Sequence, residues 1–281
     1  MRLLDYSRVD YSLDQVSVSL HADHKKIVLK DISIEIKQGE HIAVIGKSGA
    51  GKTTFLETLA LANMPTSGQF KVLGDFPWRL SNLARHKLRS NLFLTPQQPP
   101  LPPRQRVITS VLAGCLPQWS LWKALSSLFP PKDSALAYAA LKPFAIEDKL
   151  FSRVDRLSGG ERQRVSLARM FASNANILLV DEPLSALDPA LSHTVLTAII
   201  DEAKKRNATL ICCLHQTELA CSSFPRIIGL RDGKLLFDLP SAEVTQDLIA
   251  LLYQQVSAQA DVFTGLNKSP SKLPHLDGNL C

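Results

Sequence analysis

The eight residues 46–53 constrain this chain more than any other stretch. They read Gly-Lys-Ser-Gly-Ala-Gly-Lys-Thr and match the phosphate-binding pattern G-x-x-x-x-G-K-[ST]. The apolar run 41–45 precedes them and a helical pattern starts at Thr54, so the loop lies between a predicted strand and a predicted helix. The alternative is a chance match in a glycine-bearing turn, which this context disfavours. We therefore predict a nucleoside triphosphate site.

The residue types of this loop suit a chain of phosphates. Its glycines allow backbone N–H groups to surround a phosphate, and the start of the next helix adds partial positive charge. Lys52 supplies a charge for the β- and γ-phosphates, and the Thr53 hydroxyl suits Mg²⁺. The predicted nucleotide contacts are Gly46, Lys47, Ser48, Gly49, Ala50, Gly51, Lys52, Thr53 and Thr54.

Two adjacent acids follow the apolar run 177–180. A buried parallel strand of this kind delivers its last residue to the carboxyl edge of the sheet, where the phosphate loop also lies. We predict that Asp181 reaches Mg²⁺, directly or through a water, and that Glu182 acts as a general base on water. The alternative is an ordinary strand end at the surface, which the apolar run and the neighbouring loop disfavour.

A second candidate anion site is Leu157-Ser158-Gly159-Gly160-Glu161, which precedes a predicted helix reaching residue 172. A structural interpretation is equally available, because Ser158 can cap the helix and Glu161 can complete a capping box. The two interpretations are compatible, since the cap builds the helix whose end binds a phosphate.

The charge and cysteine content narrow the class of protein. The formal net charge of +6 suits nucleic acid or an anionic membrane surface, but the basic residues look scattered and without interleaved aromatics. We expect a solvated face and no nucleic-acid partner. Five cysteines, an odd number without framework spacing, predict reduced thiols. Cys212 and Cys213 alternate across a predicted strand, so we expect no metal site that joins them to His215 and Cys221.

No segment approaches the roughly 20 apolar residues of a membrane-spanning helix, and the first ten residues have no apolar signal core. We therefore expect the chain to stay on the cytoplasmic side. Strands alternate with helices around the phosphate loop, which predicts an α/β fold with a mostly parallel sheet. Residues 16–20 and 28–36 alternate apolar and polar side chains, and predict a small antiparallel N-terminal sheet.

Five prolines among residues 96–103 exclude a helix or central strand there and predict an extended linker. The stretch 107–144 is helical in pattern and carries an apolar band that either packs in the core or faces a partner. Its members are Trp119, Leu121, Trp122, Leu125, Leu128 and Phe129. The stretch from Arg79 to Arg89 predicts a polar helix, and the stretch from Ala242 to Tyr253 predicts the last helix. Beyond Ser257 the composition predicts a mobile tail.

The order of these motifs, followed by Ser-Ala-Leu-Asp and a histidine after a strand, resembles the ATP-binding cassette (ABC) family of transport ATPases. The likeness covers roughly residues 13–253. It implies a P-loop ATPase domain over 1–255 with a helical insertion at about 100–165, leaving 256–281 as the tail. It also implies ATP and Mg²⁺ as ligands, Gln97 as a contact of Mg²⁺ or the attacking water, Asp188 at a dimer interface, and His215 at the γ-phosphate.

The same resemblance implies a homodimer in which Ser158, Gly159 and Gly160 of one copy complete the site of the other. It further implies transmembrane permease subunits, an extracytoplasmic substrate-binding protein, and a peripheral position on the cytoplasmic face of the inner membrane. Relatives usually stack adenine on an aromatic near Leu20-His21, so here His21 or Leu20 is expected to take that place. Gln97-Gln98 is usually followed by an aromatic, but Pro99 stands here.

Within the family, Val111-Leu112-Ala113-Gly114 and the segment 120–129 look most like the ATPase subunits of phosphonate importers. Two alternatives stay open: a soluble cassette ATPase in a phosphonate-metabolising assembly, and an importer subunit for another substrate. A nucleic-acid-associated cassette ATPase is disfavoured, because those usually carry two cassettes or a long coiled coil.

Overall fold

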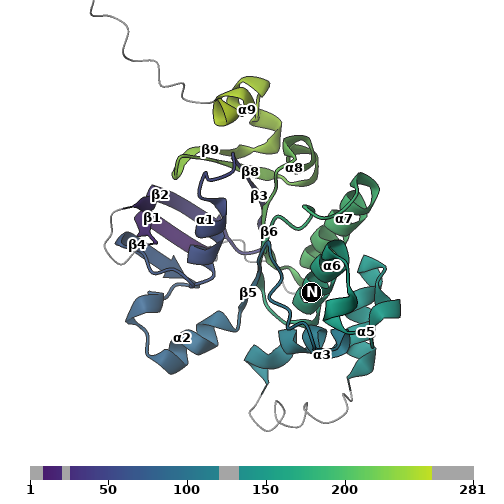
Figure 1. The fold of residues 1–281 in the computed structure, drawn as a ribbon. Helices are drawn as coiled ribbons and strands as arrows, with labels where there is room; N and C mark the ends of the chain where they lie inside the picture. The colour runs from purple at the N-terminus through teal and green to yellow at the C-terminus, as the bar shows by residue number, and fades with distance from the viewer. Residues whose placement is uncertain (1–8, 21–25, 120–132, 255–281) are drawn as a thin grey trace, which may run out of the picture.

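Two sheets organise the protein (Figure 1). The structure is a computed structural model and describes residues 9–20, 26–119 and 133–254. The smaller sheet is antiparallel, has the order β2-β1-β4, and consists of β1 Val9–Ser19, β2 Ile27–Lys37 and β4 Ser67–Val72. The alternation of apolar and polar residues predicted this sheet, and the prediction is confirmed.

The larger sheet has the order β5-β6-β7-β3-β8-β9. Its first five strands run parallel and β9 pairs antiparallel with β8. The strands are β3 His41–Ile45, β5 Leu92–Thr95, β6 Ile177–Asp181, β7 Thr209–Cys213, β8 Arg226–Arg231 and β9 Lys234–Pro240. Because β3 and β6 are both parallel and fully buried, their carboxyl ends bring the phosphate loop and Asp181 to one edge.

The α-helices in the described residues are α1 Lys52–Leu59, α2 Asn82–Arg89, α3 Val107–Leu112, α5 Ser134–Leu141, α6 Gly159–Ala172, α7 Pro189–Arg206, α8 Thr217–Ser223 and α9 Gln246–Tyr253. Short 3₁₀ turns lie at Pro77–Arg79, Ala113–Gln118, Lys142–Phe144, Glu147–Lys149, Val154–Arg156 and Ser241–Glu243. None of the helices in this part of the chain combines the length and apolarity that a membrane crossing needs.

Two predicted helices begin later than expected, and side-chain caps explain both shifts. The helix expected from Arg79 starts at Asn82, because the Ser81 hydroxyl accepts the Ala84 N–H and ends the preceding turn. The helix expected from Ala242 starts at Gln246, where Thr245 accepts the Leu248 N–H in the same way. The helical stretch 107–144 is present as α3 and α5 with adjoining turns.

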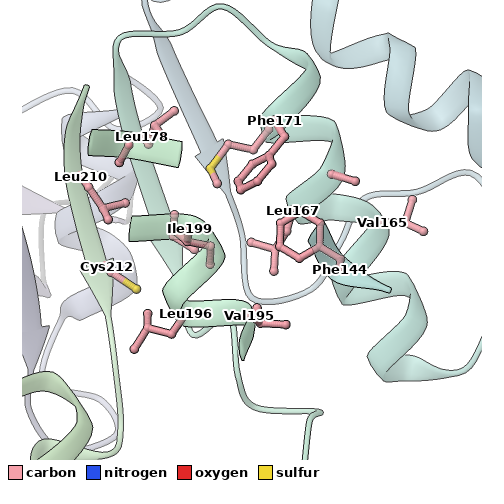
Figure 2. Close-up of a cluster of buried hydrophobic side chains, with 14 of the residues drawn as sticks. Phe144, Val165, Leu167, Phe171, Leu178, Val195, Leu196, Ile199, Leu210 and Cys212 are labelled. Atoms are coloured by element: carbon pink, nitrogen blue, oxygen red, sulfur yellow. The ribbon is translucent and has the colours of Figure 1, made fainter. Parts of the chain in front are cut away.

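Apolar cores cover both faces of the larger sheet. Figure 2 shows one of them, in which Phe144 from the helical part and Phe171 of α6 pack with side chains of β6, β7 and α7. Cys212 belongs to this core and Cys213 to the core on the other face, so the two thiols point in opposite directions as predicted. Trp119 packs against the same core as Cys212. The other members of the predicted apolar band, like the predicted tail, lie outside the described residues.

The helical part is built around α6, because α3 and α5 both pack against it. The sheet order places β5, which leads into this part, at one edge of the larger sheet. The bounds expected for the helical insertion, about 100–165, stay a prediction.

A buried hydroxyl joins the two sheets. Thr209, at the start of β7, donates to the Asp10 carboxylate of β1 at 2.5 Å and accepts the Gly39 N–H at 2.8 Å. Thr209 has no exposed surface and Asp10 is 3% exposed, so water cannot replace either bond without rearrangement. The contact therefore sets how the antiparallel sheet sits against the strand that carries the phosphate loop.

We expect Thr209→Val to lower the free energy of unfolding by about 1–3 kcal/mol. The substitution removes one hydrogen bond from the Gly39 N–H and one from the buried Asp10 carboxylate. Urea unfolding followed by circular dichroism measures the change. Thr209→Ser keeps the hydroxyl and should recover most of the loss. The control is Thr194→Val on the exposed face of α7, where about 0.5 kcal/mol or less is expected. Equal stability of Thr209→Val and the native chain would contradict this assignment.

Candidate functional site

The loop 46–53 wraps around its own lysine. Lys52 is 5% exposed, and its Nζ donates to the carbonyl oxygens of Gly46 at 2.9 Å and Lys47 at 3.4 Å. Gly51 has φ +102°, a left-handed conformation that favours glycine. A Cβ on Gly46 would lie 2.2 Å from the Leu230 carbonyl oxygen, so only glycine lets the loop lie this close to β8. The predicted strand–loop–helix is thus present, with the helix beginning at Lys52 rather than Thr54.

Asp181 ends β6 directly beside this loop. The Thr53 hydroxyl donates to Asp181 Oδ2 at 2.8 Å, whereas Asp181 Oδ1 is buried and has no hydrogen-bond partner among the described residues. Burial raises the pKa of the Asp181 carboxyl, and the Thr53 hydrogen bond opposes that rise. A buried carboxylate oxygen with an open lone pair, next to a hydroxyl, fits a hard cation such as Mg²⁺, which takes oxygen ligands.

Glu182 is the meeting point of three chain segments. Its Oε2 accepts a hydrogen bond from Gln97 Nε2 at 2.6 Å, and its Oε1 lies 2.5 Å from His215 Nε2 and 3.8 Å from Lys52 Nζ. The residue has φ +49°, so the chain leaves the extended conformation immediately after Asp181. The contact with Lys52 places the Glu182 carboxylate beside the phosphate loop.

A buried glutamine that the sequence analysis missed holds the backbone of Glu182. Gln163 of α6 donates to the Glu182 carbonyl at 2.7 Å and accepts the Ala186 N–H at 3.2 Å. It therefore links the helix after Gly159-Gly160 to the segment after β6. Gln163 lies four residues after Gly159, on the face of α6 that carries the buried Leu167. A polar residue on that apolar face was the signal that the sequence offered for its role.

These groups line a cleft of about 650 Å³ between the phosphate loop and the smaller sheet. The loop side is lined by Ser48, Gly49, Gly51, Lys52, Thr53 and Thr54, and the side at the carboxyl ends of β5, β6 and β7 by Gln97, Glu182 and His215. The opposite wall consists of Leu20, Lys26, Ile27, Val28, Lys30, Asp232 and Gly233. Of these, sequence reasoning named Leu20 alone, as a candidate for stacking on the base. His21, the other candidate for stacking on the base, lies outside the described residues.

The opposite wall is joined to the phosphate loop by backbone hydrogen bonds. The Gly233 N–H donates to the Ala50 carbonyl at 3.1 Å, and the Gly233 carbonyl accepts the Lys30 N–H at 2.8 Å. Lys47 and Ala50 line a neighbouring hollow of about 380 Å³ with Arg231 and Leu252. The turn between β8 and β9 thus fixes the width of the cleft. Only tertiary packing brings this turn to the loop, and for that reason local sequence patterns did not show it.

Ser158, Gly159 and Gly160 do not line this cleft. The predicted capping box is confirmed: the Glu161 N–H donates to Ser158 Oγ at 3.2 Å, and the Ser158 N–H donates to Glu161 Oε2 at 2.7 Å. That backbone hydrogen bond lowers the pKa of the Glu161 carboxyl. Asp188 likewise caps a helix, because its carboxylate accepts the Leu191 N–H at 2.9 Å at the start of α7. Four predicted nucleotide contacts thus lie away from the P-loop cleft of their own chain.

Comparisons with known proteins agree with this geometry. Residues 29–185 match the model of the ABC transporter family. The chain is 56% identical over 227 residues to phosphonates import ATP-binding protein PhnC 2 of Albidiferax ferrireducens, covering 81% of this chain and 82% of the relative. It is 53% identical over 249 residues to phosphonates import ATP-binding protein PhnC of a Polaromonas species, covering 88% of this chain and 90% of the relative.

Solved structures show the same architecture. One is the dimeric structure of an ATP-binding cassette in a post-hydrolysis state bound to ADP and Pi, with a TM-score of 0.69 at 26% identity; the alignment covers 82% of this chain and 98% of that chain. Another is a bacterial Atm1-family ABC exporter with ATP bound, with a TM-score of 0.71 at 25% identity, covering 90% of this chain and 43% of that chain. By its motifs, its fold and these relatives, the chain belongs to the ABC transporter family.

Proposed function

We propose that this chain is the ATP-hydrolysing subunit of an importer, and that it couples ATP binding and hydrolysis to the passage of phosphonates or related phosphorus oxyanions through a partner permease. The observation that carries the ATPase assignment is the Glu182 carboxylate, held by Gln97 and His215 beside the lysine of the phosphate loop. The names of the relatives at 56% and 53% identity, both phosphonates import ATP-binding proteins, support the substrate class.

The cleft has the parts needed to bind ATP. Backbone N–H groups of the loop and the ammonium of Lys52 face the phosphates, and the exposed apolar side chains of Leu20 and Ile27 offer a surface for the base. In the described structure Lys52 donates to carbonyl oxygens of its own loop, which hold its charge in the cleft before nucleotide arrives. Bound phosphates replace these partners at little reorganisation cost.

Mg²⁺ fits beside Thr53 and Asp181, where Asp181 Oδ1 is buried without a partner among the described residues, and Gln97, which lines the same cleft, is the third proposed ligand. The ion, when bound, would neutralise negative charge on the β- and γ-phosphates. Thr53 and Asp181 already contact each other, so the chain itself orients both groups before the ion binds.

Glu182 is the proposed general base. Before nucleotide binds, both of its carboxylate oxygens contact side chains, Gln97 on one and His215 on the other. For a water to reach the base, at least one of these contacts must open, and the phosphates provide competing partners for His215 and Lys52. Hydrolysis therefore depends on a rearrangement that ATP itself promotes, with Gln163 holding the Glu182 backbone in place meanwhile.

The active unit in this proposal is a head-to-tail homodimer. Ser158, Gly159, Gly160 and Asp188 lie on helix starts outside the cleft of their own chain, so they are available to complete the site of a second copy. The related cassette of known structure with ADP and Pi is dimeric. The dimer is peripheral on the cytoplasmic face of the inner membrane, binds the permease near Gln97, and works with an extracytoplasmic substrate-binding protein.

We expect Glu182→Gln to lower ATP turnover by about 10²–10⁴-fold while nucleotide affinity changes little, because the amide keeps the shape but cannot take a proton. Lys52→Ala should instead weaken ATP binding, since it removes a charge that contacts bound phosphates. Steady-state phosphate release and nucleotide titration separate the two effects. The matched control is Glu218→Gln on the exposed surface of α8, which should hydrolyse at the native rate. Native turnover in Glu182→Gln would refute the base assignment.

Mixing two inactive variants tests the composite dimer. Lys52→Ala chains and Ser158→Arg chains should each hydrolyse ATP poorly, but a heterodimer places both lesions in one site and leaves the other intact. We expect the mixture to regain up to about half the native activity per heterodimer if each site works independently. Analytical ultracentrifugation with ATP confirms that dimers form. Heterodimers without recovered hydrolysis would contradict the head-to-tail arrangement.

The substrate assignment predicts a growth phenotype. Deletion of the gene should abolish growth on a phosphonate as sole phosphorus source and leave growth on phosphate unchanged. A plasmid copy should restore growth, whereas a Glu182→Gln copy should not. Uptake of labelled phosphonate separates transport from metabolism: normal uptake without growth would favour the soluble assembly. Normal uptake and growth would mean another substrate for the importer.

A further inference from the structure

The positive charge of the chain is concentrated in one segment. Residues 76–132 contain eight Lys and Arg and no Asp or Glu, so this segment carries +8, while the whole chain carries +6 and the remainder therefore −2. The expectation of scattered basic residues is wrong for this stretch. Neither the nucleotide cleft nor the catalytic groups use these cations, because among the described lining residues of the cleft this segment supplies Gln97 alone.

The cations of this segment are also unpaired in the part of the chain that the structure describes. Some basic side chains elsewhere have carboxylate partners, as Arg226 does with Glu40 at 2.6 Å and Asp238 at 2.7 Å. By contrast, no ion pair with a described carboxylate involves the segment's described cations, which are Arg79, Arg85, Lys87, Arg89, Arg104 and Arg106. The electrostatic field of these cations therefore acts on the solvent or on a binding partner, because no described carboxylate neutralises it.

Around α2 these cations lie on aromatic rings. The guanidinium of Arg79 lies 4.4 Å from the centroid of the Phe76 ring, and that of Arg85 lies 5.3 Å from the Trp78 ring. The Lys71 ammonium, just outside the segment, also lies over the Phe76 ring, with its Nζ 4.9 Å from the centroid. Such contacts hold the charges at defined places on the surface without neutralising them.

Helix α2 presents an apolar side chain among these charges. Leu88 is buried and packs α2 onto the core, whereas Leu83 is 81% exposed. Lys87 lies one helical turn beyond Leu83 and therefore on the same side of the helix. Arg85 and Arg89 lie on the other side of the helix, where Arg85 donates to Asn82 Oδ1 and Arg89 to the Leu61 carbonyl. An exposed leucine beside an exposed lysine, in a segment without carboxylates, suits the interface of an anionic bilayer.

We propose that this basic face, defined as Arg79 in the turn before α2 and Leu83 and Lys87 on α2, binds the anionic phospholipid headgroups of the membrane. The proposal rests on the proposed function, because a permease bound near Gln97 would bring the neighbouring α2 close to the bilayer. Figure 1 places α2 and α3 at the same end of the molecule, on either side of β5. Nucleic acid would use the cations, but it offers no apolar layer for Leu83, so lipid fits the whole face better.

Co-sedimentation of the purified full chain with protein-free vesicles tests this. We expect binding to an equimolar mixture of phosphatidylcholine and phosphatidylglycerol, little binding to phosphatidylcholine alone, and loss at high salt. The double variant Arg79→Gln/Lys87→Gln should weaken vesicle binding about thirtyfold, because it removes two charges that are attracted to the anionic surface. Lys204→Gln/Lys205→Gln at the end of α7 removes the same charge and should bind normally. Leu83→Ser should weaken binding without changing its salt dependence.

Three outcomes would overturn the proposal: no binding of the native chain to mixed vesicles, equal weakening in both double variants, or binding only when the vesicles contain the permease. An RNA homopolymer serves as the competing probe, and RNA binding without vesicle binding would assign the face to nucleic acid. ATP hydrolysis and thermal melting of each variant are measured in parallel. Native values there show that a lost lipid contact leaves the ATPase assignment intact.

Discussion

The arrangement of the site depends on a carboxylate that is buried beside a cation. The side chain of Glu182 is 9% exposed, and a charge removed from water to that extent requires partners. It obtains them from three separate segments: the phosphate loop supplies Lys52, the segment after β5 supplies Gln97, and the segment after β7 supplies His215. Because all three partners meet on one carboxylate, we expect a ligand that competes for Lys52 to alter the contacts of Gln97 and His215 as well. We therefore expect phosphate binding to be coupled to movement of Gln97.

The parallel sheet makes this convergence possible. Strands β3, β6 and β7 are adjacent, parallel and buried throughout, so their carboxyl ends open at one edge and release Gly46, Asp181 and Leu214 side by side. The Thr209 hydroxyl then joins the other end of β7 to the antiparallel sheet, whose β2 forms the far wall of the cleft. The cleft is thus bounded by two sheets whose relative position is set by hydrogen bonds that water cannot reach.

Most of the strands and the centre of the site could be predicted from local sequence, because each depends on a short pattern with a direct physical cause. The phosphate loop, Asp181 and the Ser158 capping box are of this kind. Gln163 and Gly233 could not, since each acts through contacts with residues distant in the chain, such as Glu182 and Ala50. Helix starts at Asn82 and Gln246 were misplaced because apolar periodicity does not mark a cap. The basic face was missed because charge was judged along the chain as a whole.

The position of β5 suggests how a phosphate signal leaves the site. This strand lies at the edge of the sheet with β6 as its one neighbour in the described sheet, so it is held by hydrogen bonds on a single side. Gln97 follows its carboxyl end and α2 precedes its amino end. If α2 rests on the membrane and the permease lies next to it, one end of this short segment is held while the other responds to Glu182. A displacement of Gln97 is then transmitted through the proline-rich linker to α3. The prolines restrict the backbone of the linker and prevent it from shortening into a helix.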